Sequence, residues 1–153
     1  MQLKATDIIK SSNLDLKIVE ESVKSIALNN AYAGAVNFLI LELIKAYDIN
    51  NDFTNCLEIT LRLCEWLEEY DSSSYIYVIN KYQIIKRLRK LSKGEKFKLR
   101  EIGVASAENN PILCGISILL DNKNDVEYYF DKLTKEESKA FCEYPIYKLL
   151  NRI

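Results

Sequence analysis

Apolar residues recur at three- and four-residue steps along almost the whole chain, and this spacing constrains the fold more than any other feature of the sequence. The segment Asn30–Asp48 is apolar around nearly the full circumference of a helix, which is typical of a central helix. The chain has only four Gly and two Pro, so it has little material for the tight turns of an all-β sandwich. We therefore expect an all-α fold.

Capping residues and prolines divide the chain into about nine expected helices. Ser92-Lys93-Gly94-Glu95 and Thr134-Lys135-Glu136-Glu137 have the capping-box pattern that begins a helix. Asn109-Asn110-Pro111 and Pro145 mark two further helix starts. The expected helices are 16–29, 30–48, 52–70, 75–91, 95–107, 111–120, 125–133, 134–142 and 146–150.

Most connections between these helices are short, which favours antiparallel neighbours. Three helix pairs begin about 40 residues apart, a period typical of helical repeats. The pairs are 30–48 with 52–70, 74–91 with 95–107, and 111–120 with 125–133. We predict one domain, residues 1–153, of antiparallel helical hairpins with tetratricopeptide-like, α-solenoid packing.

One of these hairpins also resembles a known family. The segment Pro111–Leu133, PILCGISILLDNKNDVEYYFDKL, resembles a tetratricopeptide-type hairpin, with small residues in its first helix, a short polar turn and an aromatic-rich second helix. The tail FCEYPIYKLL is similar to the closing segment of helical modules in bacterial proteins linked to anti-phage defence or toxin systems. The resemblance covers Ser74–Leu150 and implies protein binding, in the role of an adaptor, immunity protein or regulatory subunit.

The absence of histidine excludes several kinds of enzyme. With no His in the chain, Ser-His-Asp and Cys-His catalysis, imidazole zinc sites and a histidine general base are all ruled out. Tyr77 and Lys81 have the spacing found in short-chain dehydrogenases, but the Gly-rich turn of those enzymes is missing. We expect no cofactor, no metal and no enzymatic activity; an enzyme that works with carboxylates is kept as a third alternative.

The cysteines and the lack of long apolar runs indicate the compartment. Cys56, Cys64, Cys114 and Cys142 form no C-x-x-C pair, and we expect reduced, mostly buried thiols. Reduced thiols are typical of the cytoplasm. No secretory signal is visible and no apolar run has the length of a membrane span. We therefore expect a cytoplasmic protein without a membrane partner.

Charge is distributed unevenly although the net charge is only -1. Residues 42–71 are mainly acidic, whereas residues 81–100 hold nine basic residues and one acidic residue, Glu95. Such a basic segment is typical of a surface for nucleic acid or for an acidic partner. It is also typical of a solvated face that pairs with the acidic segment.

We predict a partner-binding face within this basic segment. Helical spacing places several cations near one side, and an aromatic ring in the same helix is suited to anchoring or stacking. The predicted residues are Tyr82, Lys86, Arg87, Arg89, Lys90 and Lys93. We expect a protein partner; nucleic acid bound to the same face is the alternative.

Overall fold

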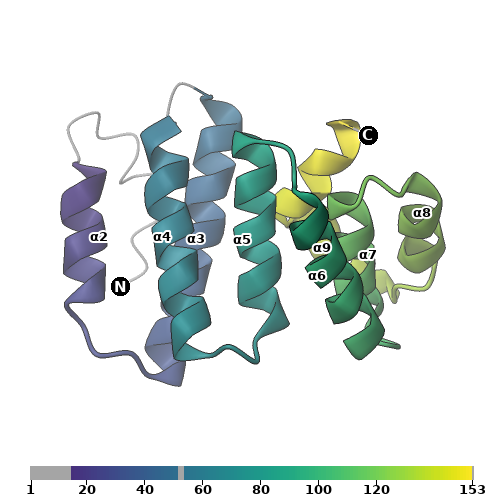
Figure 1. Cartoon of the computed structure of the whole chain (residues 1–153), viewed down its shortest axis with the longest axis horizontal. Coiled ribbons are helices and arrows are strands. Elements are labelled where there is room, and N and C mark those ends of the chain that lie inside the picture. Colours follow the sequence, from purple (N-terminus) through teal and green to yellow (C-terminus); the bar gives the residue numbers. More distant parts are fainter. Residues whose placement is uncertain (1–14, 52–53, 153) are drawn as a thin grey trace. The chain divides into compact units, whose positions relative to one another are not determined.

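The computed structural model describes residues 15–51 and 54–152. In these residues the chain is all-α, as expected, with eight α-helices, one final 3-10 helix and no strand (Figure 1). The elements in chain order are α2 (Leu16–Lys24), α3 (Asn30–Ile49), α4 (Thr54–Tyr70), α5 (Tyr75–Leu88), α6 (Lys93–Ala105), α7 (Asn110–Leu119), α8 (Lys123–Asp131), α9 (Lys135–Glu143) and η1 (Pro145–Arg152).

Each helix expected from the sequence is present, with ends that differ by a few residues. The helix expected to reach residue 29 ends at Lys24, and the last element is a 3-10 helix. The capping box that begins α6 is complete, because Ser92 Oγ accepts from the Glu95 N–H at 3.1 Å and Glu95 Oε2 accepts from the Ser92 N–H at 2.7 Å. At α9, Thr134 Oγ1 accepts from the N–H three residues later.

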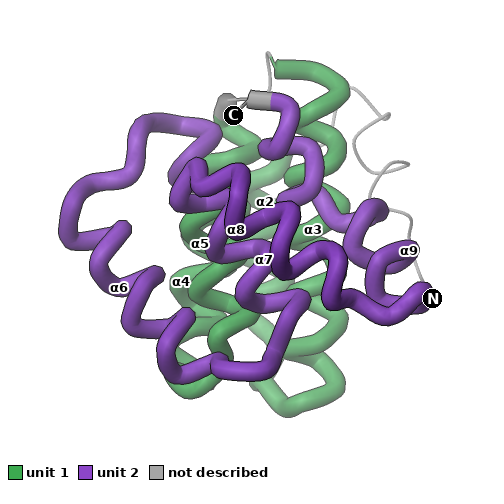
Figure 2. Tube along the Cα trace, turned by 90° about the vertical axis from the view of Figure 1, so that its right-hand side faces the viewer, with its two compact units in different colours: residues 1–84 green, residues 85–153 purple. Residues whose placement is uncertain are grey.

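The chain divides into two compact units, residues 1–84 and residues 85–153, which Figure 2 shows in green and purple. The boundary falls inside α5, so residues 75–84 belong to the first unit and residues 85–88 to the second. The single domain expected from the sequence, residues 1–153, stays a prediction.

In the first unit, α3 packs against α4, which confirms the predicted pairing of 30–48 with 52–70. Ile40 and Ile44 of α3 and Leu63 and Leu67 of α4 are fully buried in this core. Burying a side chain of this size stabilises the fold by about 1.5–3 kcal/mol. Helix α2 lies beside α4 (Figure 1).

An ion pair joins α2 to α4. The Arg62 guanidinium donates to both carboxylate oxygens of Glu20, at 2.8 and 2.9 Å. These hydrogen bonds hold the pKa of Glu20 below its usual value, against the opposing effect of burial. The buried carboxylate of Glu20 in α2 is therefore neutralised by a cation of the neighbouring helix α4.

In the second unit, α7 is the central helix and packs against α6, α8 and η1. Its contact with α8 confirms the predicted pairing of 111–120 with 125–133. Ile118 and Leu119 of α7 are fully buried, and Leu99 and Ile102 form the inner side of α6. The stacking of these hairpins into a solenoid stays a prediction.

All four thiols are free, as expected, and three of them are buried: Cys56, Cys64 and Cys114. Burial raises the pKa of Cys64 and raises that of Cys114 to about 12. Cys142, on α9, is exposed. Among the described residues, no helix combines the length and the apolar character needed to cross a membrane.

Candidate protein-docking surface

An ion pair in the first unit joins the acidic and basic segments. Lys81 Nζ of α5 donates to Glu68 Oε2 of α4 at 2.5 Å, and the same ammonium lies 5.2 Å from the centre of the Tyr82 ring. Tyr82 itself is only 5% exposed. The ring expected to anchor a partner is therefore buried. Its role in binding stays a prediction, and burial of the ring argues against that role.

Lys86, a predicted binding residue, caps the C-terminus of α7 instead of facing solvent. Its ammonium donates to the carbonyls of Ile118 and Leu119, at 3.3 and 2.9 Å, and to Asp121 Oδ1 at 2.5 Å. Asp121 has a positive φ of 59° and ends the helix. The Ile118 carbonyl also accepts from the Asp121 N–H at 3.1 Å, so the cation adds a contact at the end of the helix and interacts favourably with the helix dipole.

Two further predicted residues also bond within the second unit. Arg87 is buried, and its Nη2 donates to the carbonyl of Pro145 at 2.9 Å. Arg89 is exposed and donates to both carboxylate oxygens of Glu95, at 2.9 and 2.6 Å. This guanidinium and the N–H of Ser92 lower the pKa of Glu95 to about 2. Much of the basic segment therefore stabilises the unit itself.

The remaining cations lie toward and along α6. Lys90 and Lys93 are exposed, and among the described residues neither has an ion-pair partner. Lys93, Phe97, Arg100 and Val104 follow one another at steps of four, three and four residues, which places them on one side of a helix. We call these four residues the α6 face. Glu101 is exposed next to it.

The α6 face combines apolar and basic side chains. Phe97 is 61% exposed and Val104 is 82% exposed, and the two are separated by about 10 Å along the helix axis. Arg100 is exposed and, like Lys93, has no ion-pair partner among the described residues. Two exposed apolar side chains therefore share one side of α6 with two cations.

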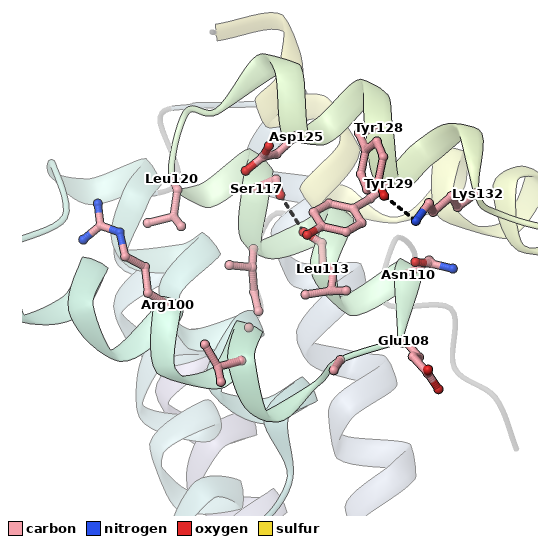
Figure 3. Close-up of a pocket in the computed structure, with 14 residues that line it drawn as sticks. Arg100, Glu108, Asn110, Leu113, Ser117, Leu120, Asp125, Tyr128, Tyr129 and Lys132 are labelled. Carbon is pink, nitrogen blue, oxygen red and sulfur yellow. Dashed lines mark hydrogen bonds between the residues drawn. The ribbon is translucent and has the colours of Figure 1, made fainter.

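A groove in the second unit adjoins this face. It has a volume of about 500 Å³ and is formed by α6, α7 and α8 (Figure 3). Arg100 and Val104 belong both to the α6 face and to the wall of the groove. Apolar side chains of α7 and of the residue that follows it line the groove, namely Leu113, Ile116 and Leu120. We call this cavity the α6–α8 groove.

Helix α8 gives the groove an aromatic wall. Tyr128 and Tyr129 stand with their rings edge to face, 5.1 Å apart between centroids. Lys132 Nζ donates to Tyr128 Oη at 2.6 Å and lies 4.1 Å from the centre of that ring. Lys132 lies on the opposite side of the groove from Arg100 (Figure 3). Both positive groups therefore stand at the margins of an apolar surface.

The acidic residues of the groove do not converge. Asp125 and Glu108 lie at opposite ends in Figure 3, and Asp125 Oδ2 accepts from Asn122 Nδ2 at 2.6 Å. A pair of carboxylates that acts on one substrate must face it together. In the described part of the chain, no group of three or more Cys, Asp or Glu side chains is arranged to hold a metal ion.

Sequence reasoning found the basic segment but missed the groove and the two exposed apolar residues. The spacing of Lys93, Phe97, Arg100 and Val104 was the available signal. It becomes informative only when Leu99 and Ile102 are known to face the core, because that assigns the other side of α6 to the surface.

Comparison of the chain with protein-family models, with curated proteins and with solved structures finds no significant match. The geometry of the second unit and the sequence are therefore the basis for a functional proposal.

Proposed function

We propose that this chain is a non-enzymatic protein–protein interaction module whose second unit binds a partner protein. The role is that of an adaptor, immunity or regulatory protein with tetratricopeptide-like helical hairpins, acting in the cytoplasm. The resemblance of Ser74–Leu150 to modules linked to bacterial defence and toxin systems supports this role. The observation that carries the proposal is the exposure of Phe97 and Val104 on the same side of α6 as Lys93 and Arg100.

The proposed partner segment is an acidic amphipathic helix. Its apolar side chains pack on Phe97 and Val104 and enter the α6–α8 groove, and its carboxylates face Lys93 and Arg100. Binding of an amphipathic helix along an apolar surface is a common recognition mode, and charge complementarity selects the acidic partner. A ring as exposed as Phe97 is a good anchor, and its truncation costs about 2 kcal/mol of binding energy.

Nucleic acid bound to the face predicted from the sequence is the alternative, but contacts within the chain occupy much of that face. Binding of a single strand combines free cations with exposed rings for base stacking. Here Lys86, Arg87 and Arg89 form contacts inside the second unit, and Tyr82 is buried.

The proposal is tested with variants of the full chain that change the α6 face alone. The test variants are Phe97→Ala and the double variant Lys93→Glu with Arg100→Glu. Their matched controls are Ile76→Ala, on a residue that is 53% exposed, and Lys135→Glu with Lys139→Glu, on exposed lysines of α9. All are used as bait in extracts of the source cells after nuclease treatment, with captured proteins quantified by mass spectrometry.

We expect one protein, recovered in stoichiometric amount by the unchanged chain and by both controls, to be lost with both test variants. Its binding segment should then compete as a synthetic peptide. Capture that is equal for test and control variants would refute the docking surface. Loss of all binding on nuclease treatment, with an affinity for an oligonucleotide that falls steeply with salt, would favour nucleic acid instead.

A further inference from the structure

A second exposed apolar surface lies in the first unit, on the outer side of α3. Phe38 is 50% exposed and Ile49 is 77% exposed, while the inner side of the same helix packs against α4. Ala31, Gly34 and Ala35 continue the exposed side toward the start of the helix. A Cβ added at Gly34 would meet no atom within 4 Å. The described part of the chain therefore leaves this side of α3 uncovered around Gly34, Phe38 and Ile49.

Between the two large apolar residues stand two charges of opposite sign. Glu42 and Lys45 lie on the same side of α3 and form an ion pair of 2.9 Å. Both are partly buried. We call Phe38, Glu42, Lys45 and Ile49 the α3 face. Its charges balance, which distinguishes it from the mainly basic α6 face.

We propose that two copies of this chain associate through the α3 face, with the two α3 helices antiparallel across a two-fold axis. Glu42 then lies opposite Lys45 of the second copy, and Phe38 lies opposite Ile49 of the second copy. One register gives both pairings, because Glu42 follows Phe38 by four residues and Lys45 precedes Ile49 by four residues. A two-fold interface presents the same surface from both sides and requires such self-complementarity.

Charge complementarity identifies a second copy as the occupant. A partner segment of a single charge sign would place a like charge against either Glu42 or Lys45, which is unfavourable. The contact is small, since residues 38–49 span about 18 Å of helix. An interface at the low end of the usual size range is weak, and we expect a dimer that dissociates at about 10–100 µM.

The test is sedimentation equilibrium of the full chain from about 5 to 500 µM, a range that brackets the expected dissociation constant. Phe38→Gln and Ile49→Gln remove the apolar contacts, and Ile18→Gln on α2, where the side chain is 60% exposed, is the matched control. In a double variant, Glu42→Lys with Lys45→Glu, the two charges are exchanged and the face stays self-complementary. Circular dichroism checks that each variant is folded.

We expect dimers of the unchanged chain and the control, and at least about a tenfold weaker association for Phe38→Gln and Ile49→Gln. The charge-exchanged variant should dimerise with itself but not with the unchanged chain, because mixing would place Glu against Glu and Lys against Lys in this register. A monomer at the highest concentration would overturn the proposal. So would a dimer that tolerates both Gln variants, or free mixing of the exchanged and unchanged chains. The α3 and α6 faces belong to different units, so either proposal can fail without the other.

Discussion

Replacing Lys86 by Met tests whether this residue stabilises the second unit. Met keeps an unbranched apolar side chain but removes the ammonium that bonds to the carbonyls of Ile118 and Leu119. Only 14% of the Lys86 side chain is exposed, whereas its ion-pair partner Asp121 is 50% exposed. The hydrogen bonds to the end of α7 should therefore account for most of the stability that is lost when Lys86 is replaced. The ion pair with Asp121 should contribute little.

The magnitude follows from these contacts. Hydrogen bonds to a charged group contribute about 1.5–3 kcal/mol, a cation at a helix C-terminus about 0.3–1 kcal/mol, and an ion pair with an exposed partner at most about 0.5 kcal/mol. One ammonium makes all three interactions, so they overlap, and we expect Lys86→Met to lower the free energy of unfolding by about 2–3 kcal/mol. With the denaturant dependence usual for small proteins, the urea midpoint should fall by about 1 M or more.

The assay is urea unfolding of the full chain followed by circular dichroism, with Lys90→Met as the control. Lys90 is exposed and has no ion-pair partner in residues 15–51 and 54–152, so its replacement should change stability by less than about 0.5 kcal/mol. Equal midpoints for the two variants would refute the structural role of Lys86. A binding defect of a Lys86 variant is therefore informative only when its stability is measured as well.

Three further predictions concern α6. Glu95, with its pKa lowered to about 2, should stabilise the fold above about pH 4.5 and lose this contribution as the pH falls toward 2. In Glu95→Gln, the free energy of unfolding should therefore depend less on pH over that range, and an unchanged dependence would contradict the pairing with Arg89. Ser106→Ala should leave the free energy of unfolding unchanged or raise it by up to about 1 kcal/mol, because the buried Ser106 hydroxyl has no partner among the described residues; a clear loss in urea unfolding would show that the hydroxyl is satisfied. Gly103→Ala should raise the midpoint of thermal unfolding, since Ala is favoured over Gly inside a helix by about 1 kcal/mol and the new Cβ meets Ile116 at an ordinary 3.9 Å. A lower midpoint would mean that the side chains around Gly103 leave no room for a methyl group.

Local signals in the sequence were sufficient to predict the helices but not to predict which residues form the candidate docking surface. Ser92 begins a helix through contacts that lie within three residues, so its role is readable from the capping pattern. Lys86 and Arg87 bond to groups that lie 32 to 58 residues further along the chain. Their spacing is equally compatible with an exposed basic face, and only the packing of α7 and η1 decides between the two positions. Tyr82 is buried for a similar reason, because α5 carries apolar residues on more than one side.

The placement of one tryptophan and one exposed thiol allows each unit to be observed separately. Trp66, the one tryptophan of the chain, lies in α4 of the first unit. Cys142, the exposed thiol, lies in α9 of the second, and the buried thiols are poorly reactive because a thiolate must form before the sulfur attacks a reagent. A dye attached at Cys142 that absorbs where Trp66 emits would form a donor–acceptor pair with it. The transfer efficiency would report the distance between the units in solution, while each fluorophore alone would report the unfolding of its own unit.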